Sequence, residues 1–230
     1  MTETVLQLKD VQFDWTKRAE FSLSVPDFAM RKGETVLLLG ESGSGKSTLL
    51  SLICGTLVPQ AGSIKVADAD MTTLSASARD RFRAERIGVI FQQFNLLPFG
   101  TVADNIQLPL RFAPERRQKA GDVGNATQNL LDALGLSRSV IIAKASTLSV
   151  GQQQRVAVAR ALIGQPSLII ADEPTSALDA ATQSAFLDVL FEQVAASGAS
   201  LLMVSHDARL ADRFDRTVTM DDLTKPKVAV

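Results

Sequence analysis

The sequence contains one cysteine, one histidine and no tyrosine among its 230 residues. The lone cysteine, Cys54, excludes an internal disulfide and a cysteine-rich metal site, and it is compatible with a reducing compartment. The lone histidine, His206, excludes every site that needs two histidines. The chain therefore has neither an internal disulfide framework nor a site built on a histidine pair.

The chain also lacks an excess of charge and a long apolar run. Its 24 Lys and Arg residues against 25 Asp and Glu residues give a net charge of -1, which argues against binding nucleic acid mainly through bulk positive charge. Residues 1–10 lack a basic start followed by an apolar run, so we expect no signal peptide. The longest uncharged stretch, residues 47–64, contains two glycines and a proline and is not a membrane span. We expect any membrane association to depend on a partner.

Hydrophobic spacing predicts an α/β fold in three zones. Alternation at Phe21, Leu23 and Val25 predicts a half-buried antiparallel strand, and Ile64 with Val66 predicts another. Short, continuously apolar runs of the kind found in a parallel sheet covered on both faces occur at 36–39, 87–91, 168–171 and 201–204. The zones are a β-rich start, a largely helical insertion at about 95–160, and a sheet core on either side of it.

Within the insertion, the spacing of Leu130, Leu131 and Leu134 predicts a helix that stops at Gly135. The charged, glycine-bearing stretch 114–124 indicates a surface connection. The run 140–143 is the one segment there that has the apolar character of a core strand.

The run at 36–39 leads directly into residues 40–47, G-E-S-G-S-G-K-S, a complete G-x-x-x-x-G-K-[ST] phosphate loop. The glycines let the backbone turn tightly and present its N–H groups to phosphates, while the lysine meets the β- and γ-phosphates and the final serine meets Mg²⁺. A helix predicted at 48–54 adds a dipole that favours anions. The predicted nucleotide-binding residues are Gly40, Glu41, Ser42, Gly43, Ser44, Gly45, Lys46, Ser47 and Thr48.

The loop alone does not choose between a small-molecule kinase, a GTPase and a motor-type ATPase. The apolar run at 168–171 ends in Asp172 and Glu173. A carboxylate at a strand tip suits Mg²⁺, as in a Walker B element. The next carboxylate is placed to hold the attacking water as a general base. We therefore predict Asp172 as a metal ligand and Glu173 as a catalytic residue.

Residues 148–162 read as an amphipathic helix with Ser149 as its N-cap. A capped helix alone would explain this segment. Its start, L-S-V-G-Q, also resembles the signature motif of ATP-binding cassette (ABC) proteins, usually L-S-G-G-Q. In that family the serine and helix N-terminus of one subunit close on the γ-phosphate held by the other. The resemblance covers essentially the whole chain and implies that Ser149, Gly151 and Gln152 contact nucleotide.

The same resemblance assigns four further residues. Trp15 resembles the aromatic residue that stacks on adenine, with Phe13 as a rival. Gln92 resembles the Q-loop glutamine that touches Mg²⁺ and the water. Asp179 ends a segment resembling the D-loop, which crosses the dimer interface. His206 resembles the switch histidine near the γ-phosphate.

One departure from the family pattern is Val150, which stands where the first signature glycine is usual. Glycine would allow backbone conformations that valine does not, yet we expect a mild effect because the neighbouring signature residues are kept. The arginines at 79, 81, 83 and 86 indicate a solvated helix face, and Cys54 indicates a core position.

The resemblance implies one nucleotide-binding domain, 1–230: a P-loop NTPase (RecA-like) core with an antiparallel β subdomain and an inserted helical subdomain. It implies Mg-dependent ATP hydrolysis at two composite sites of a head-to-tail homodimer, with Ser47, Gln92 and Asp172 serving the metal. The hydrolysis would power a separate membrane permease, FtsX-like, from the cytoplasmic face of the inner membrane. The segments 92–98, 101–106 and 108–110 resemble the macrolide-efflux and lipoprotein-release branch. An amino-acid importer ATPase, a soluble ABC protein of repair or translation, and a metabolite kinase are the alternatives.

Overall fold

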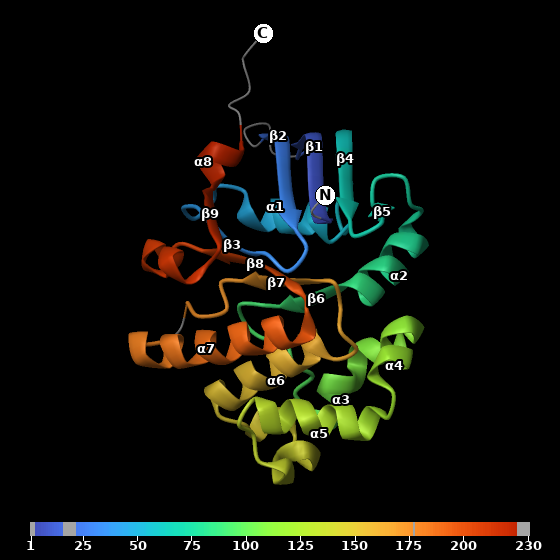
Figure 1. Cartoon of the computed structure of the whole chain (residues 1–230), viewed down its shortest axis with the longest axis vertical. Helices are drawn as coiled ribbons and strands as arrows, with labels where there is room; N and C mark the ends of the chain where they lie inside the picture. The colour runs from blue at the N-terminus through green and yellow to red at the C-terminus, as the bar shows by residue number, and fades with distance from the viewer. Residues whose placement is uncertain (1–2, 16–21, 177, 225–230) are drawn as a thin grey trace. The chain divides into compact units, whose positions relative to one another are not determined.

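The computed structural model describes residues 3–15, 22–176 and 178–224, and the chain divides into two compact units (Figure 1). Unit 1 comprises Met1–Arg86 and Ser200–Val230, and unit 2 comprises Ile87–Ala199. In the described part of the chain, no helix has the length and apolar character needed to cross a membrane.

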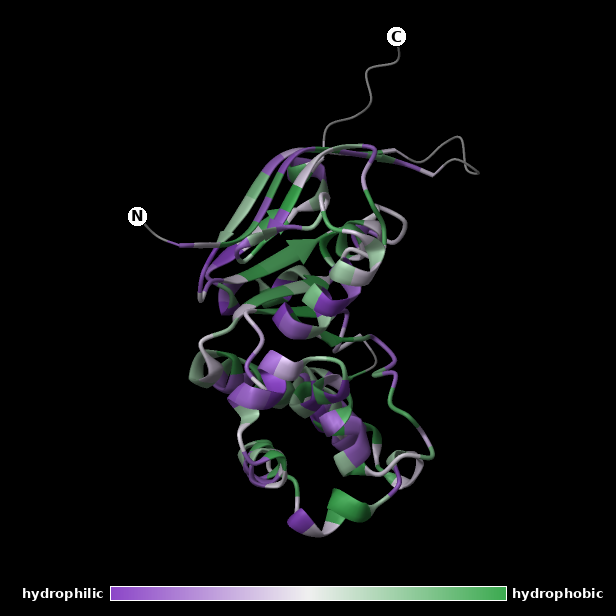
Figure 2. Ribbon diagram, turned by 90° about the vertical axis from the view of Figure 1, so that its right-hand side faces the viewer, coloured by the Kyte–Doolittle hydropathy of each residue, from purple (hydrophilic) through white to green (hydrophobic). Residues whose placement is uncertain are grey.

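Unit 1 contains an antiparallel sheet in which β1 (Thr4–Asp14) lies between β2 (Ser22–Arg31) and β4 (Ala61–Val66), and β5 (Ala69–Asp70) pairs with β4. Figure 2 shows hydrophilic and hydrophobic residues alternating along these strands. The alternation buries one face of the sheet, as expected for period-2 side chains. Leu23 and Val25 are buried, so the predicted strand is confirmed, while Phe21 lies outside the described residues.

Unit 1 also contains three parallel strands. The central strand β3 (Thr35–Leu39) pairs in parallel with β8 (Ser200–Ser205) and with β9 (Arg216–Thr219). Every residue of β8 is buried, which explains its continuous apolar run and confirms the strands predicted at 36–39 and 201–204. The strand β9 was not predicted, because its four residues are all half-buried and only one of them is apolar.

The described helices of unit 1 are α1 (Lys46–Ile53), α2 (Ala76–Arg86), the 3₁₀ helix η4 (Ala208–Arg213) and α8 (Met220–Leu223). The first of these begins two residues earlier than predicted and ends before Cys54, which caps it and is buried as expected.

Two arginines of α2 bind the carboxyl-terminal end of α1. Arg79 Nε donates to the carbonyl of Gly55 across 3.3 Å, and Arg83 Nη1 donates to the carbonyl of Cys54 across 3.2 Å. A cation at a helix C-terminus satisfies carbonyls that lack intrahelical partners. The prediction of a purely solvated basic face is therefore wrong for these two residues.

Unit 2 combines a parallel strand pair with most of the helices. β6 (Ile87–Ile90) pairs in parallel with β7 (Leu168–Asp172), which confirms the strands predicted at 87–91 and 168–171. The helices are α3 (Val102–Gln107), η1 (Leu108–Arg111), α4 (Pro114–Ala120), α5 (Val123–Ala133), η2 (Arg138–Ile142), η3 (Ala145–Thr147), α6 (Val150–Leu162) and α7 (Ala180–Ser197). The helix predicted around Leu131 is α5, and Gly135 follows it in the left-handed conformation at φ 64°.

Two sequence predictions for unit 2 are wrong. The stretch 114–124 is not a connection, since it contains α4 and the start of α5. Pro114 suits the first helical turn, and the charged side chain of Arg116 is 1% exposed, donating from Nε to the carbonyl of Ile163 across 2.9 Å. The apolar run at 140–143 is no core strand either: it lies in and just after η2, with Ile142 79% exposed.

Candidate functional site

The phosphate loop connects β3 to α1 in unit 1. Gly43 and Gly45 both adopt left-handed φ angles, 84° and 99°, which side chains with a Cβ rarely tolerate. Gly45 is also the N-cap residue of α1. Loops with this geometry direct consecutive N–H groups toward one point and, with the helix N-terminus behind them, form an anion-binding site.

Lys46 and Ser44 lie within this loop. The ammonium group of Lys46, a residue that is 7% exposed, donates to the carbonyls of Gly40 at 2.6 Å and Glu41 at 2.8 Å. The hydroxyl of Ser44 is buried and has no hydrogen-bond partner among the described residues. A buried hydroxyl without a partner is costly. A phosphate oxygen would satisfy it, so the loop fits a polyphosphate ligand.

A cavity of about 310 Å³ adjoins the loop within unit 1. It is lined by Leu39, Gly40, Glu41, Ser44, His206, Ala208, Thr219, Met220 and Asp221. His206 reaches it because β3 and β8 are parallel neighbours whose carboxyl ends meet at one edge, with the Gly40 N–H donating to the Ser205 carbonyl across 3.4 Å. The structure thus brings His206 and the phosphate loop to one cavity.

The same cavity contains residues that the sequence did not single out. Thr219, Met220 and Asp221 come from the end of β9 and from α8. No motif in the sequence marks them, because their place depends on the pairing of β9 with β3.

Trp15 follows β1 and lies against α1. Its indole Nε1 donates to the hydroxyl of Thr48 across 3.4 Å, and the residue is 41% exposed. Phe13 is 7% exposed and packs edge-on against Trp15, with the ring centroids 5.3 Å apart. A buried ring has no free face for a base, so the geometry favours Trp15 over Phe13 as an adenine platform.

The carboxylates of unit 2 lie at the end of β7. Asp172 is the last residue of the strand, and Glu173 follows it at φ 44°, a left-handed angle that is uncommon outside glycine. Both side chains are half-buried. Backbone strain of this kind persists where the surroundings fix it and is frequent at active sites.

Gln92 in unit 2 is joined to the segment after these carboxylates. Its amide Nε2 donates to the Ser176 hydroxyl across 3.2 Å. Asp179 is the N-cap of α7 and accepts from the Thr182 N–H at 3.0 Å and from the Thr182 hydroxyl at 2.7 Å. These bonds lower the pKa of the Asp179 carboxyl, the backbone bond having the larger effect.

The predicted signature segment begins α6. Ser149 is its N-cap, and a capping box joins Ser149 to Gln152 in both directions, at 3.3 Å and 3.0 Å. Val150 is the first helical residue, is 56% exposed and lacks a positive φ. A Cβ built on Gly151 would meet nothing within 4 Å. Neither position requires glycine for its backbone, so valine at 150 introduces no strain.

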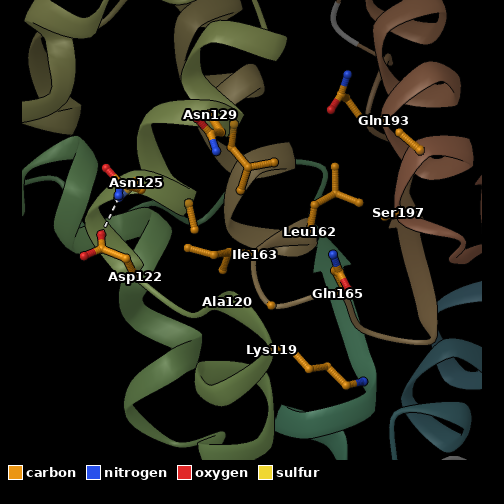
Figure 3. Close-up of a pocket in the computed structure, with 14 residues that line it drawn as sticks. Lys119, Ala120, Asp122, Asn125, Asn129, Leu162, Ile163, Gln165, Gln193 and Ser197 are labelled. Carbon is orange, nitrogen blue, oxygen red and sulfur yellow. Dashed lines mark hydrogen bonds between the residues drawn. The ribbon is translucent and has the colours of Figure 1, made fainter.

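A second cavity, of about 380 Å³, lies in unit 2 and is shown in Figure 3. Residues of α4, α5, the end of α6 and α7 line it, among them Asn129, Leu162, Gln165 and Gln193. None of the predicted site residues lies there. No cluster of three or more histidine, cysteine, aspartate or glutamate residues forms a metal site in the described ranges. Mg²⁺ does not need such a cluster, since it is usually held by one or two carboxylates together with substrate phosphates.

A phosphate loop after a buried strand, with paired carboxylates after another, defines a P-loop nucleoside triphosphatase. The family model described as ABC transporter matches residues 23–176. This is more than half of the chain, which therefore belongs to the ABC transporter family.

Two curated relatives can be aligned with this chain over most of their own length. The lipoprotein-releasing system ATP-binding protein LolD of Anaeromyxobacter dehalogenans is 42% identical over 196 residues, covering 85% of this chain and 81% of the relative. The uncharacterized ABC transporter ATP-binding protein YbbA of Escherichia coli K12 is 38% identical over 194 residues, covering 84% and 83%.

A solved structure also matches this chain along almost its whole length. The ATP-binding cassette MJ0796, a dimer in a post-hydrolysis state bound to ADP and Pi, is 32% identical with a TM-score of 0.75, covering 94% of each chain. The chain thus has the ABC cassette fold and is the ATP-binding, ATP-hydrolysing subunit of an ABC transporter.

Proposed function

We propose that this subunit powers a separate membrane permease that exports a substrate or releases a lipoprotein or lipid-linked cargo. The observation that carries the proposal is the 42% identity to a lipoprotein-releasing LolD protein along four-fifths of that protein's length. The subunit would then be peripheral, held at the cytoplasmic face of the inner membrane by its permease.

In unit 1, residues 40–48 would bind ATP. The loop N–H groups and Lys46 neutralise the phosphates, the Ser44 hydroxyl donates to a phosphate oxygen, and Trp15 stacks on adenine. Ser47, Gln92 and Asp172 are the residues that would hold Mg²⁺. When bound, the metal supplies Lewis-acid stabilisation of negative charge on the phosphates.

In unit 2, the Glu173 carboxylate accepts a proton from the attacking water, and Gln92 orients that water. His206, which belongs to unit 1, stabilises the charge that develops on the γ-phosphate. Most of the rate enhancement comes from positioning and electrostatics, because phosphoryl transfer needs little covalent chemistry from the protein.

The active assembly in this proposal is a homodimer. Ser149 and Gly151 from one subunit approach the γ-phosphate bound by the other, and Asp179 lies at the interface. The capping box at Ser149 supports this role, since it fixes the serine at a helix N-terminus whose dipole favours anions. The dimeric state of MJ0796 gives further support.

Exposed apolar side chains in unit 2 support contact with a permease. Backbone hydrogen bonds pair 98–102 with 143–146, from the Val102 N–H to Ala143 and from the Ala145 N–H to Gly100. Next to this pairing, Leu97 is 45% exposed, Phe99 87% and Ile142 79%. Large exposed apolar side chains gathered in adjoining segments are typical of interaction sites. An FtsX-like permease is the partner we propose for this surface, and a reading frame for such a permease beside this gene would support it.

The test is reconstitution of the subunit with that permease in proteoliposomes. A triacylated lipopeptide should stimulate ATP hydrolysis, whereas free amino acids should not. Phe99→Ser should lose permease-stimulated hydrolysis and keep the basal rate. The matched control is Val58→Ser, an exposed apolar residue of unit 1 that should leave stimulation unchanged. Stimulation by an amino acid with its binding protein would instead favour the importer alternative.

A further inference from the structure

A buried arginine of α6 binds the backbone of the loop that carries Gln92. Arg160 is 7% exposed, and its guanidinium donates to the carbonyl of Asn95 at 2.6 Å and to the carbonyl of Phe94. The guanidinium carbon lies 5.9 Å from the centroid of the Phe91 ring, within the range of a cation–π contact. One side chain therefore contacts the loop on both sides of Gln92.

The part of the loop that Arg160 binds is strained. Phe94 and Asn95 have φ angles of 58° and 46°, both left-handed, and a bulky residue such as phenylalanine seldom adopts this conformation. Such angles cost free energy and persist only where the surroundings impose them. Two charge-assisted bonds to adjacent carbonyls supply that constraint.

A second side chain of α6 binds the loop after Glu173. Gln154 is 1% exposed, and its Nε2 donates to the Pro174 carbonyl across 2.9 Å. Pro174 directly follows Glu173, which is itself left-handed at φ 44°. The bond from Gln92 to the Ser176 hydroxyl, 3.2 Å long, then joins the two loops to each other.

We propose that Arg160 and Gln154 are positioning residues for ATP hydrolysis, through which α6 holds the loops of Gln92 and Glu173 in their working conformations. The inference rests on the roles proposed above for Gln92 and Glu173. It adds that α6, the helix capped by Ser149, fixes these loops from within the same subunit.

The geometry requires a guanidinium at position 160. An ammonium group is a point charge without the planar fork that binds two neighbouring carbonyls at once. Arg160→Lys therefore keeps the charge and loses part of the constraint, while Arg160→Met keeps much of the volume and loses both bonds. Burial lowers the pKa of the Arg160 guanidinium, which nevertheless stays protonated at neutral pH.

The control is Arg155→Lys. Arg155 belongs to the same helix and also donates to two carbonyls, those of Leu134 and Gly135, both at 3.2 Å. These carbonyls follow α5 and lie outside both loops. The substitution makes the same chemical change as Arg160→Lys. The contacts that it weakens, however, are those with Leu134 and Gly135 and not those with the loop of Gln92.

The first measurement is hydrogen exchange of residues 91–98, with residues 46–53 as the internal reference. Exchange of 91–98 should accelerate in the order wild type, Arg160→Lys, Arg160→Met, and it should not change in Arg155→Lys. If the exchange of this segment is unchanged in Arg160→Met, the proposal is overturned, whether or not Gln92 has the catalytic role proposed above. A global loss of protection, seen also at 46–53, would identify Arg160 as a fold-stabilising residue instead.

The second measurement is steady-state ATP hydrolysis. Misplacing catalytic groups by about 1 Å costs up to about a hundredfold, so Arg160→Met should lower kcat by about tenfold or more with KM changed by less than about twofold. Arg160→Lys should recover part of this loss, and Gln154→Leu should lower kcat in the same way.

The third measurement separates this proposal from the role assigned to Gln92. If Arg160 acts through Gln92, Arg160→Lys should have little further effect on kcat in a Gln92→Ala background. Full additivity would overturn the coupling. If Gln92→Ala alone hydrolyses ATP at the wild-type rate, the role of Gln92 fails, and the exchange data still decide whether Arg160 holds the loop.

Discussion

The indole nitrogen of Trp15 donates a hydrogen bond to the hydroxyl of Thr48 across 3.4 Å. Thr48 lies in the first turn of α1, two residues after the lysine of the phosphate loop. The residue that follows the first strand is thereby hydrogen-bonded to the helix that begins at the phosphate site, and it stays 41% exposed. This places an aromatic face beside the loop that we expect to bind ATP.

Replacing Trp15 with alanine should weaken ATP binding by about tenfold or more, because stacking on a base is worth roughly 1–3 kcal/mol. Trp15 is the only tryptophan, and the chain has no tyrosine, so its emission reports this position alone. Titrating Mg-ATP into Glu173→Gln protein should therefore give a saturable change in fluorescence. GTP should bind too, since stacking depends little on the identity of the base.

The control for Trp15 is Trp15→Phe, which removes the hydrogen bond to Thr48 and keeps an aromatic face. It should weaken binding less than Trp15→Ala does. If ATP binding is measured independently and the emission does not change, stacking at Trp15 is refuted.

Glu173→Gln should keep ATP binding and lose hydrolysis, because the amide has nearly the same shape and is a poor base. Loss of general-base catalysis typically lowers kcat by about 10²–10⁴-fold. The variant should then accumulate as an ATP-bound dimer, which size-exclusion chromatography would detect. Turnover near the wild-type rate would show that another group activates the water.

Ser149→Ala should impair hydrolysis while leaving ATP binding to the monomer almost intact, since the serine would act across the dimer. The structure adds a complication: Ser149 also caps α6, and losing an N-cap costs about 1 kcal/mol of stability. Ser149→Asn is the matched control, because asparagine caps helices as well as serine does. Both variants should lose kcat, and Ser149→Ala alone should lose thermal stability.

Mixing Ser149→Ala with Lys46→Ala protein tests whether the site is shared. One site of each mixed dimer then has an intact phosphate loop and an intact signature serine, so hydrolysis should partly recover. If mixed dimers form and activity stays absent, the composite site is wrong.

The strands and motifs could be predicted because each depends on local sequence. Continuous apolar runs marked β3, β6, β7 and β8, and the phosphate loop follows from a fixed spacing of glycines and lysine. The strand β9 was missed because its stability comes from pairing with β3 rather than from its own apolar pattern. Tertiary contacts of that kind leave no periodic signal.

The contacts of the buried arginines were missed for the same reason, because they too are tertiary contacts. Arg116 falls in the stretch predicted as a surface connection, and no motif marks Arg160 as a buried residue, since arginine is rarely buried. In the structure Arg116 donates to the carbonyl of Ile163, and Arg160 donates to the carbonyl of Asn95. Which carbonyls need such a donor depends on how the loops turn, and spacing alone does not reveal it.

Acid should destabilise unit 2 partly through Asp104. The Thr101 hydroxyl donates to this carboxylate, as does the Thr101 N–H, and Arg111 lies nearby; these contacts lower the pKa of Asp104. A carboxyl with a depressed folded-state pKa stabilises the fold above its unfolded pKa, and this contribution is lost as the pH falls through the folded value.

Thr101→Val removes the hydroxyl and should lower the urea midpoint at pH 7, whereas Thr101→Ser should not. The difference between the two variants should shrink as the pH is lowered below the unfolded pKa of aspartate, about 3.9. A difference that stays constant as the pH falls well below about 3.9, through the lowered pKa of Asp104, would show that the carboxylate is not what stabilises this turn.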